Sequence, residues 1–121
     1  MENLQAEKKE ALAAAAEYME KLIPGMGTLC EELRGSRKED TDTFQKQCID
    51  GLNWIIEIYN RTSDILNAEK ISEGKKALND NLLELGSAIA NHEDGRIADL
   101  LEKAVIPFLK ELSEEAKEAV K

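Results

Sequence analysis

The most strongly patterned segment of the chain runs from about Glu39 to Leu66, where apolar residues recur with helical spacing. The central stripe, with steps of four and three residues, comprises Cys48, Leu52, Ile55, Tyr59, Thr62 and Leu66. Such steps place side chains on one face of an α-helix. The pattern therefore predicts a helix over residues 39–66 whose central stripe faces a core.

The same helix carries apolar residues on both sides of that stripe. One flank comprises Ile49 and Ile56, and the other comprises Trp54, Ile58 and Ile65. At about 100° per residue, the whole apolar arc spans roughly 220°. A helix in a small four-helix bundle needs less apolar surface than this. We therefore expect one flank to contact a second protein chain, and we predict Trp54, Ile58 and Ile65 as contact residues.

A second apolar stripe predicts a long first helix from about Glu2 to Arg34. Its residues keep three-and-four spacing through Pro24, and they are Leu12, Ala15, Met19, Leu22, Met26, Leu29 and Leu33. A loop would normally lose this phase. Because proline cannot donate a hydrogen bond to the carbonyl of Glu20, we expect a continuous helix with a kink at Pro24. A break into two helices is the alternative.

The residues after Arg34 predict a tight turn into the second helix. Gly35 can adopt the left-handed conformation that ends a helix, and Ser36 with Glu39 matches a capping box.

Two further helices follow in the pattern. The third, which starts between Ala68 and Glu73 and ends near Asp94 and Gly95, has the stripe Ile71, Leu78, Leu82, Leu85 and Ile89. The fourth resumes immediately, with the stripe Ile97, Leu101, Ala104, Phe108 and Leu112. We expect it to fray in the charged run after Ser113.

Helices of about 33, 28, 24 and 26 residues joined by short turns predict an all-α, antiparallel up-and-down four-helix bundle with its first helix kinked at Pro24. The 121 residues suffice for one domain, residues 1–121, that needs neither disulfides nor metal for stability. The residues expected to be mostly buried are Leu22, Leu29, Leu52, Ile55, Tyr59, Leu82, Leu85, Ile89, Leu101 and Phe108.

The charge balance restricts the class of partner. Sixteen basic and twenty-five acidic residues give a net charge of −9, which disfavours nucleic acid and anionic membrane surfaces. Charged residues surround the N-terminal alanine run, so it does not resemble a signal-peptide core, and no stretch approaches a membrane span. We expect a cytoplasmic protein whose partner is another protein, either a second copy or an apolar helix.

His92 is the only histidine and the only candidate for group transfer. A small acidic bundle with one histidine fits a histidine phosphotransfer protein, which is the alternative function. Glu93 and Asp94 would repel a phosphoryl group, however, and a histidine at a helix end can cap carbonyls. We therefore favour a structural role for His92 at the end of the third helix.

Other chemistry finds little support in the sequence. Di-metal bundles need two Glu-x-x-His pairs, which one histidine cannot supply. Cys30 and Cys48 fall on apolar stripes, where cysteine commonly serves as a small buried hydrophobe, and their redox state stays open. We expect no catalytic residue, no cofactor and no metal site.

Pro107 lies inside the predicted fourth helix and leaves the carbonyl of Lys103 without its usual donor. The result is either a simple bend around the core or a polar group exposed to a partner in an apolar groove. Pro107 is therefore the fourth predicted contact residue.

Three phrases resemble small uncharacterised helical-bundle proteins of Gram-positive bacteria. They are Gly51-Leu52-Asn53-Trp54-Ile55-Ile56, Ile97-Ala98-Asp99-Leu100-Leu101-Glu102 and Ile106-Pro107-Phe108-Leu109. This resemblance implies a bundle and no particular activity. In architecture and composition the chain is also similar to flagellin export chaperones, which implies an apolar groove that takes a partner's helix.

Overall fold

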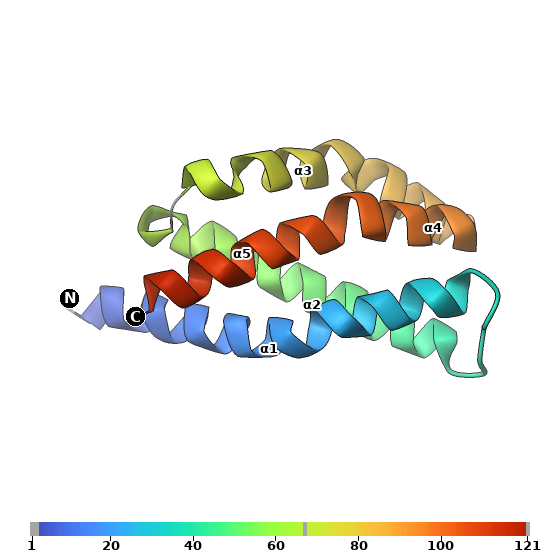
Figure 1. Ribbon diagram of the computed structural model, residues 1–121, viewed down its shortest axis with the longest axis horizontal. Coiled ribbons are helices and arrows are strands. Elements are labelled where there is room, and N and C mark those ends of the chain that lie inside the picture. The colour runs from blue at the N-terminus through green and yellow to red at the C-terminus, as the bar shows by residue number, and fades with distance from the viewer. Residues whose placement is uncertain (1–2, 67, 121) are drawn as a thin grey trace.

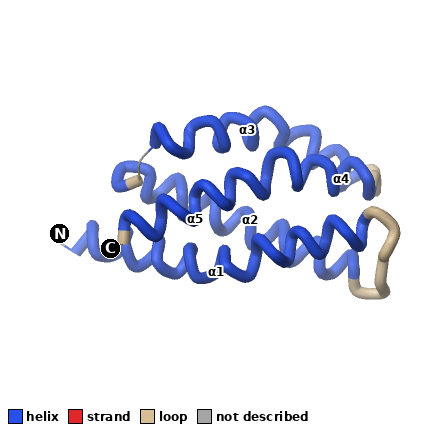
Figure 2. Tube along the Cα trace, viewed as in Figure 1, coloured by secondary structure: helices blue, strands red, loops and turns tan. Residues whose placement is uncertain are grey.

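The computed structural model describes residues 3–66 and 68–120, which are mostly helical (Figure 1). The elements are α1 (Asn3–Leu33), α2 (Thr41–Thr62), a 3-10 turn (Ser63–Ile65), α3 (Ala68–Ala90), α4 (Asp94–Leu100), a π-helical segment (Leu101–Val105) and α5 (Ile106–Ala119). No strand occurs in these two ranges (Figure 2). The last three elements are contiguous and form the fourth helix, so the predicted all-α four-helix bundle is confirmed.

The helices do not pack equally closely. Helix α1 packs against α2 and also against α4 and α5, while α3 packs against α4 and α5. Helices α2 and α3 lack the close backbone packing of these pairs. In Figure 1 the chain runs back and forth between the two ends of the molecule in successive helices, and both labelled termini lie at the same end. The bundle is therefore least closed between α2 and α3.

Helix α1 passes through Pro24 without a break. Buried residues lie before and after the proline with unchanged helical spacing, as Met19, Leu22, Met26 and Leu29 show. The alternative of two separate helices is therefore wrong, and the kink itself stays a prediction.

The connection from α1 to α2 differs from the predicted capping box of Ser36 and Glu39. Helix α2 begins only at Thr41. The buried Thr41 hydroxyl accepts a hydrogen bond from the Lys38 amide at 2.8 Å and donates one to Glu32 Oε1 at 2.8 Å. This hydroxyl connects the Glu32 carboxylate of α1 to the backbone of the loop, so it fixes the start of α2. The positive φ expected at Gly35 is present, with a value of 141°.

Two arginines at this end of the bundle connect α1 and its following loop to the fourth helix. Arg34 pairs with Asp99 at 2.7 Å and with Glu102. Arg37 pairs with Asp42 and with Asp94, each at 2.9 Å. The hydrogen bond from Arg37 lowers the pKa of Asp94.

Helix α3 ends at Ala90, earlier than the predicted stop near Asp94 and Gly95. His92 has a φ of 56°. Its amide donates to the carbonyl of Ile89, and the amide of Glu93 donates to that of Ala88. These are the two hydrogen bonds of a Schellman motif, with histidine in the left-handed position that glycine usually occupies. His92 is exposed in this turn, beyond the last residue of α3.

The fourth helix widens before Pro107. The amide of Ile106 donates to the carbonyl of Leu101, five residues earlier, which is the bond of a π-helix. Proline lacks an amide donor and its ring crowds the preceding turn, so the helix takes in one extra residue there. The predicted fraying after Ser113 is wrong, because Ala116 is fully buried and holds the following turn in place to Ala119.

Most of the predicted core is buried. The confirmed residues are Leu22, Leu29, Leu52, Ile55, Leu85, Leu101 and Phe108. Tyr59, Leu82 and Ile89 are partly buried and pack against the edge of this core. Tyr59 lies on α2 and the other two on α3. Their exposure follows from the loose packing between these two helices.

Candidate partner-binding surface

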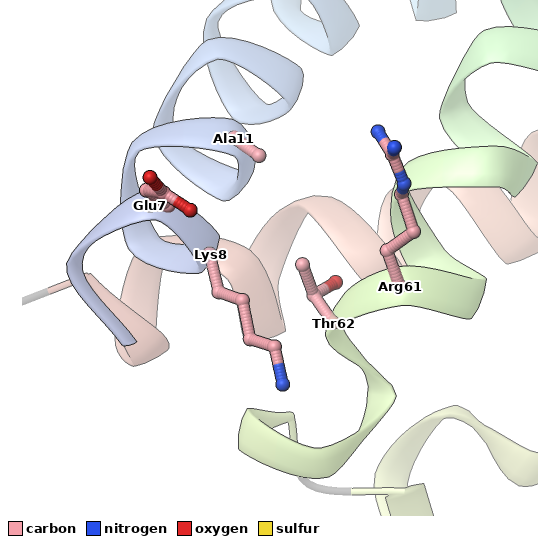
Figure 3. A pocket seen from close by; sticks show the side chains of 5 residues that line it. All are labelled: Glu7, Lys8, Ala11, Arg61 and Thr62. Carbon is pink, nitrogen blue, oxygen red and sulfur yellow. The ribbon is translucent and has the colours of Figure 1, made fainter. Parts of the chain in front are cut away.

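The surface shared by α1 and α2 contains two hollows. The larger, of about 380 Å³, is lined by Glu7, Lys8, Ala11, Arg61 and Thr62 (Figure 3). The smaller, of about 190 Å³, is lined by Tyr18, Lys21, Leu22, Gly25, Phe44, Gln47 and Cys48. Trp54 lies on α2 between the segments that line the two hollows. The residues that line the two hollows, together with Trp54, are termed the tryptophan surface.

Small residues create the larger hollow. Ala11 provides only a methyl group on the α1 side, and Figure 3 shows Lys8 and Arg61 extending in different directions, with Thr62 between them. The Thr62 hydroxyl donates to the carbonyl of Ile58 at 2.7 Å. The hydroxyl proton is therefore bound within α2, and the methyl group of Thr62 remains beside the hollow.

An aromatic pair occupies the middle of the tryptophan surface. The rings of Tyr18 and Trp54 meet edge to face, with centroids 5.6 Å apart at 84°. Gly51 makes this possible, because a Cβ atom at that position would overlap the Tyr18 hydroxyl. Trp54 nevertheless keeps 39% of its surface exposed. A large aromatic side chain is thus fixed on one side by tyrosine and open to solvent on the other.

Carboxylates flank the exposed indole. Asp50 precedes Trp54 by one helical turn, and Glu57 follows it by three residues. Burial, with contributions from Cys48 and Asp50, raises the pKa of Tyr18. The two cations of the larger hollow already have anionic neighbours, since Lys8 pairs with Asp64 at 2.7 Å and Arg61 approaches Glu57 at 3.9 Å. Charged groups of both signs therefore surround Trp54.

The structure separates the four predicted contact residues. Trp54 lies on the surface, but Ile58 is only 6% exposed and belongs to the core, which corrects its predicted outward position. Ile65 is half-buried in the 3-10 turn. Pro107 is half-buried on α5 and lines neither hollow. Helix α1 covers more of this flank of α2 than the helical pattern alone indicated.

Sequence reasoning missed the contribution of α1 to this surface. Ala11 and Gly25 lie seven residues before and after Tyr18 on α1, and Gly51 of α2 lies opposite Tyr18. Small residues on a stripe allow another helix to approach closely. This spacing was the available signal for a second helix beside Trp54.

The two thiols are poor candidates for chemistry. Cys48 contributes to the smaller hollow but is buried, as is Cys30. Burial raises the pKa of each thiol to about 11, so both are protonated at neutral pH. In the described ranges, no cluster of three or more histidine, cysteine or carboxylate side chains is arranged to hold a metal ion. No helix in those ranges has the length and apolar character needed to cross a membrane.

Comparison with known proteins places the chain in a family. The model of a domain of unknown function (DUF8042) matches residues 10–115, so the chain belongs to this family. No curated protein and no solved structure matches the chain.

Proposed function

We propose that this family member is a non-enzymatic protein-interaction module that receives an amphipathic helix of a partner on its tryptophan surface. The observation that carries the proposal is the exposed indole of Trp54, held edge-on by Tyr18 between two hollows. Tryptophan and tyrosine dominate the binding energy of protein interfaces because they contribute large contact areas at low entropic cost.

The arrangement suits a helix rather than an extended peptide. Both hollows lie between α1 and α2 and are separated along the helix axes. Residues spaced by three, four and seven positions on a partner helix form one apolar stripe. Such a stripe can place successive side chains into the two hollows and against Trp54.

The net charge of the chain favours a basic partner. Asp50 and Glu57 flank the indole, and the whole chain carries a net charge of −9. A helix with lysine or arginine beside its apolar stripe would meet these carboxylates at the rim of the contact. Complementary rim charges increase association rates and fix orientation. The proposed occupant is therefore a cationic amphipathic helix.

The surface is preorganised for binding. Tyr18 is fixed across Gly51, and both aromatic residues lie on helices that pack against each other. Less side-chain entropy is lost on binding when the receiving groups are already ordered. This supports a chaperone-like helper role, in line with the similarity in architecture to flagellin export chaperones.

A photocrosslinking experiment tests the proposal. A photoreactive phenylalanine analogue placed at position 54 should attach to one main partner in cell extract. The same analogue at exposed Lys110 on α5 is the matched control. We expect the peptide attached at position 54 to be amphipathic and basic. Equal attachment at both positions, or an acidic peptide, would contradict the proposal.

The alternative function has its own test. Incubation with a small phosphodonor such as acetyl phosphate should leave His92 unlabelled. Stable phosphorylation of His92 would instead support phosphotransfer and displace the binding proposal.

A further inference from the structure

The opposite flank of α2 forms a second surface together with α3. Tyr59 of α2 and Lys75 of α3 mark where these helices meet, since the Lys75 ammonium lies 5.0 Å from the centre of the Tyr59 ring. At about 100° per residue, Ile49 and Ile56 lie on the Tyr59 side of α2, away from α1. Leu82 and Ile89 share the stripe of Lys75, seven and fourteen residues further along α3.

This surface is accessible, and its residues include no carboxylate. Lys75 lies within it, and the exposed Lys46 and Lys76 lie at its edges, seven residues before Asn53 and Leu83. We term it the isoleucine face, and its residues are Gln45, Ile49, Asn53, Ile56, Asn60, Asn79, Leu82, Leu83, Gly86, Ile89 and Ala90. All of them are half-buried or exposed. Leu83 is 90% exposed. The chain as a whole has 25 acidic residues among 121, so a face without carboxylates across two helices is a clear departure from its average. Depletion of charge is characteristic of interface cores.

We propose that the isoleucine face binds a second copy of this chain in a symmetric dimer. Two copies that each carry a net charge of −9 repel one another, so self-association requires a face that contains no carboxylates. A basic partner would instead be favoured by carboxylates on the face, and none is present there. The charge pattern therefore selects a second copy over an oppositely charged protein.

The polar residues on this face are of the type that can pair with themselves. Asn53, Asn60 and Asn79 make no side-chain hydrogen bond to the residues that the structure describes. A carboxamide both donates and accepts hydrogen bonds. It can therefore pair with the same residue type across a two-fold axis, which neither a carboxylate nor an ammonium can do. In a two-fold dimer each contact occurs twice, so such self-complementary groups are favoured.

The face is large enough for a dimer. The face spans residues 45–60 of α2 and 75–90 of α3, which corresponds to a length of roughly 24 Å on each helix. Two helices side by side are about 20 Å wide, so the projected footprint is on the order of 500 Å². A stable interface buries about 800 Å² per partner, measured as accessible surface, which a corrugated footprint of this size can provide.

The mass of the whole chain in solution, measured by light scattering, tests this proposal. The wild-type chain should have twice its 13.5 kDa mass at micromolar concentration. Leu83→Glu should raise the dimer dissociation constant at least tenfold, because a carboxylate would be desolvated without a partner. Folding should be unaffected in that variant, since Leu83 is almost fully exposed, and circular dichroism checks this.

The matched control is Ala13→Glu, which adds the same charge at an exposed position on α1. It should leave the dimer intact. A wild-type monomer at all accessible concentrations would overturn the proposal. So would a dimer that Leu83→Glu leaves unchanged, or one that both variants weaken equally. None of these outcomes depends on whether the tryptophan surface binds a partner helix.

Discussion

The two flanks of the wide apolar arc on α2 differ in how closely a neighbouring helix packs against them. On the flank that faces α1, small residues and Gly51 allow close packing, Ile58 becomes core, and Trp54 remains exposed against Tyr18. On the flank that faces α3 the helices stay further apart, and Ile49 and Ile56 are left half-buried.

The surroundings of the two flanks differ as well. Asp50 and Glu57 flank Trp54, whereas the isoleucine face contains no carboxylate. Excess apolar surface on one helix can thus serve two kinds of contact. A charged rim suits a partner of opposite charge, and a face with amides and no carboxylate suits a second copy.

The largest expected effect on stability is at Ile58, whose substitution tests whether the flank of α2 that faces α1 belongs to the core. Ile58→Glu should destabilise the chain by more than about 3 kcal/mol, because it buries a carboxylate without a partner. Urea unfolding measures the loss. Gln47→Glu adds the same group at an exposed position on α2 and should stay within about 0.5 kcal/mol of wild type. A stable Ile58→Glu variant would place Ile58 on the surface after all.

The pH dependence of stability tests whether the Cys48 thiol, beside the smaller hollow, is shielded from solvent. Its pKa is about 11 in the folded chain against 9.0 as the reference value. Because the folded pKa is raised, this thiol contributes stability below pH 9 that is lost as pH rises through about 11. The loss should be on the order of 2 kcal/mol by pH 11. Cys48→Ala should remove this contribution, so the difference in unfolding free energy between the two proteins should shrink with pH. A constant difference would show that the thiol is open to solvent.

Gly51 tests the close approach that fixes Tyr18. Gly51→Ala should cost about 1–2 kcal/mol, because displacement of the Tyr18 ring outweighs the gain in helix propensity. The emission of Trp54 should change in the same variant. Gly27→Ala on α1 is the control, since a Cβ atom there meets nothing within 4 Å, and it should be stabilising by up to about 1 kcal/mol. Equal behaviour of the two variants would argue against the Tyr18 contact.

The smallest effect is expected at the end of α3, which borders the isoleucine face. His92→Gly should stabilise the chain by up to about 1 kcal/mol, because glycine adopts a positive φ without a steric cost. Asn91→Gly, at a position without positive φ, should be destabilising instead. Thermal denaturation distinguishes the two. A lower melting temperature for His92→Gly would show that the histidine side chain contributes more than its backbone conformation costs.

The sequence pattern was sufficient for the helices and for much of the core. Leu52 and Ile55 lie on a stripe so regular that any bundle would bury them. The pattern could not show which flank of α2 a neighbouring helix covers, because this depends on how four helices are arranged. Ile58 and Ile56 have the same chemistry, yet only Ile58 is buried.

Local signals at the helix ends were also misleading, because the position of a helix end depends on packing as well as on residue type. Gly95 is the usual residue for a left-handed helix end, but the hydrogen bonds place that conformation at His92. Pro107 pointed correctly to a disturbed helix. It did not indicate that the disturbance would take the form of a π-helical segment, because this depends on the packing of the turns on either side.

Acrylamide quenching of tryptophan fluorescence tests the central claim, that the two flanks of α2 make separate contacts. Trp54 is the only tryptophan, so the signal reports the tryptophan surface alone. Wild-type chain at a concentration where it is dimeric is compared with Leu83→Glu. We predict the same quenching constant for both, because the dimer forms through the isoleucine face and leaves Trp54 exposed. Quenching that is at least twofold weaker in the dimer would show that Trp54 is buried in the dimer interface. That result would contradict separate contacts on the two flanks.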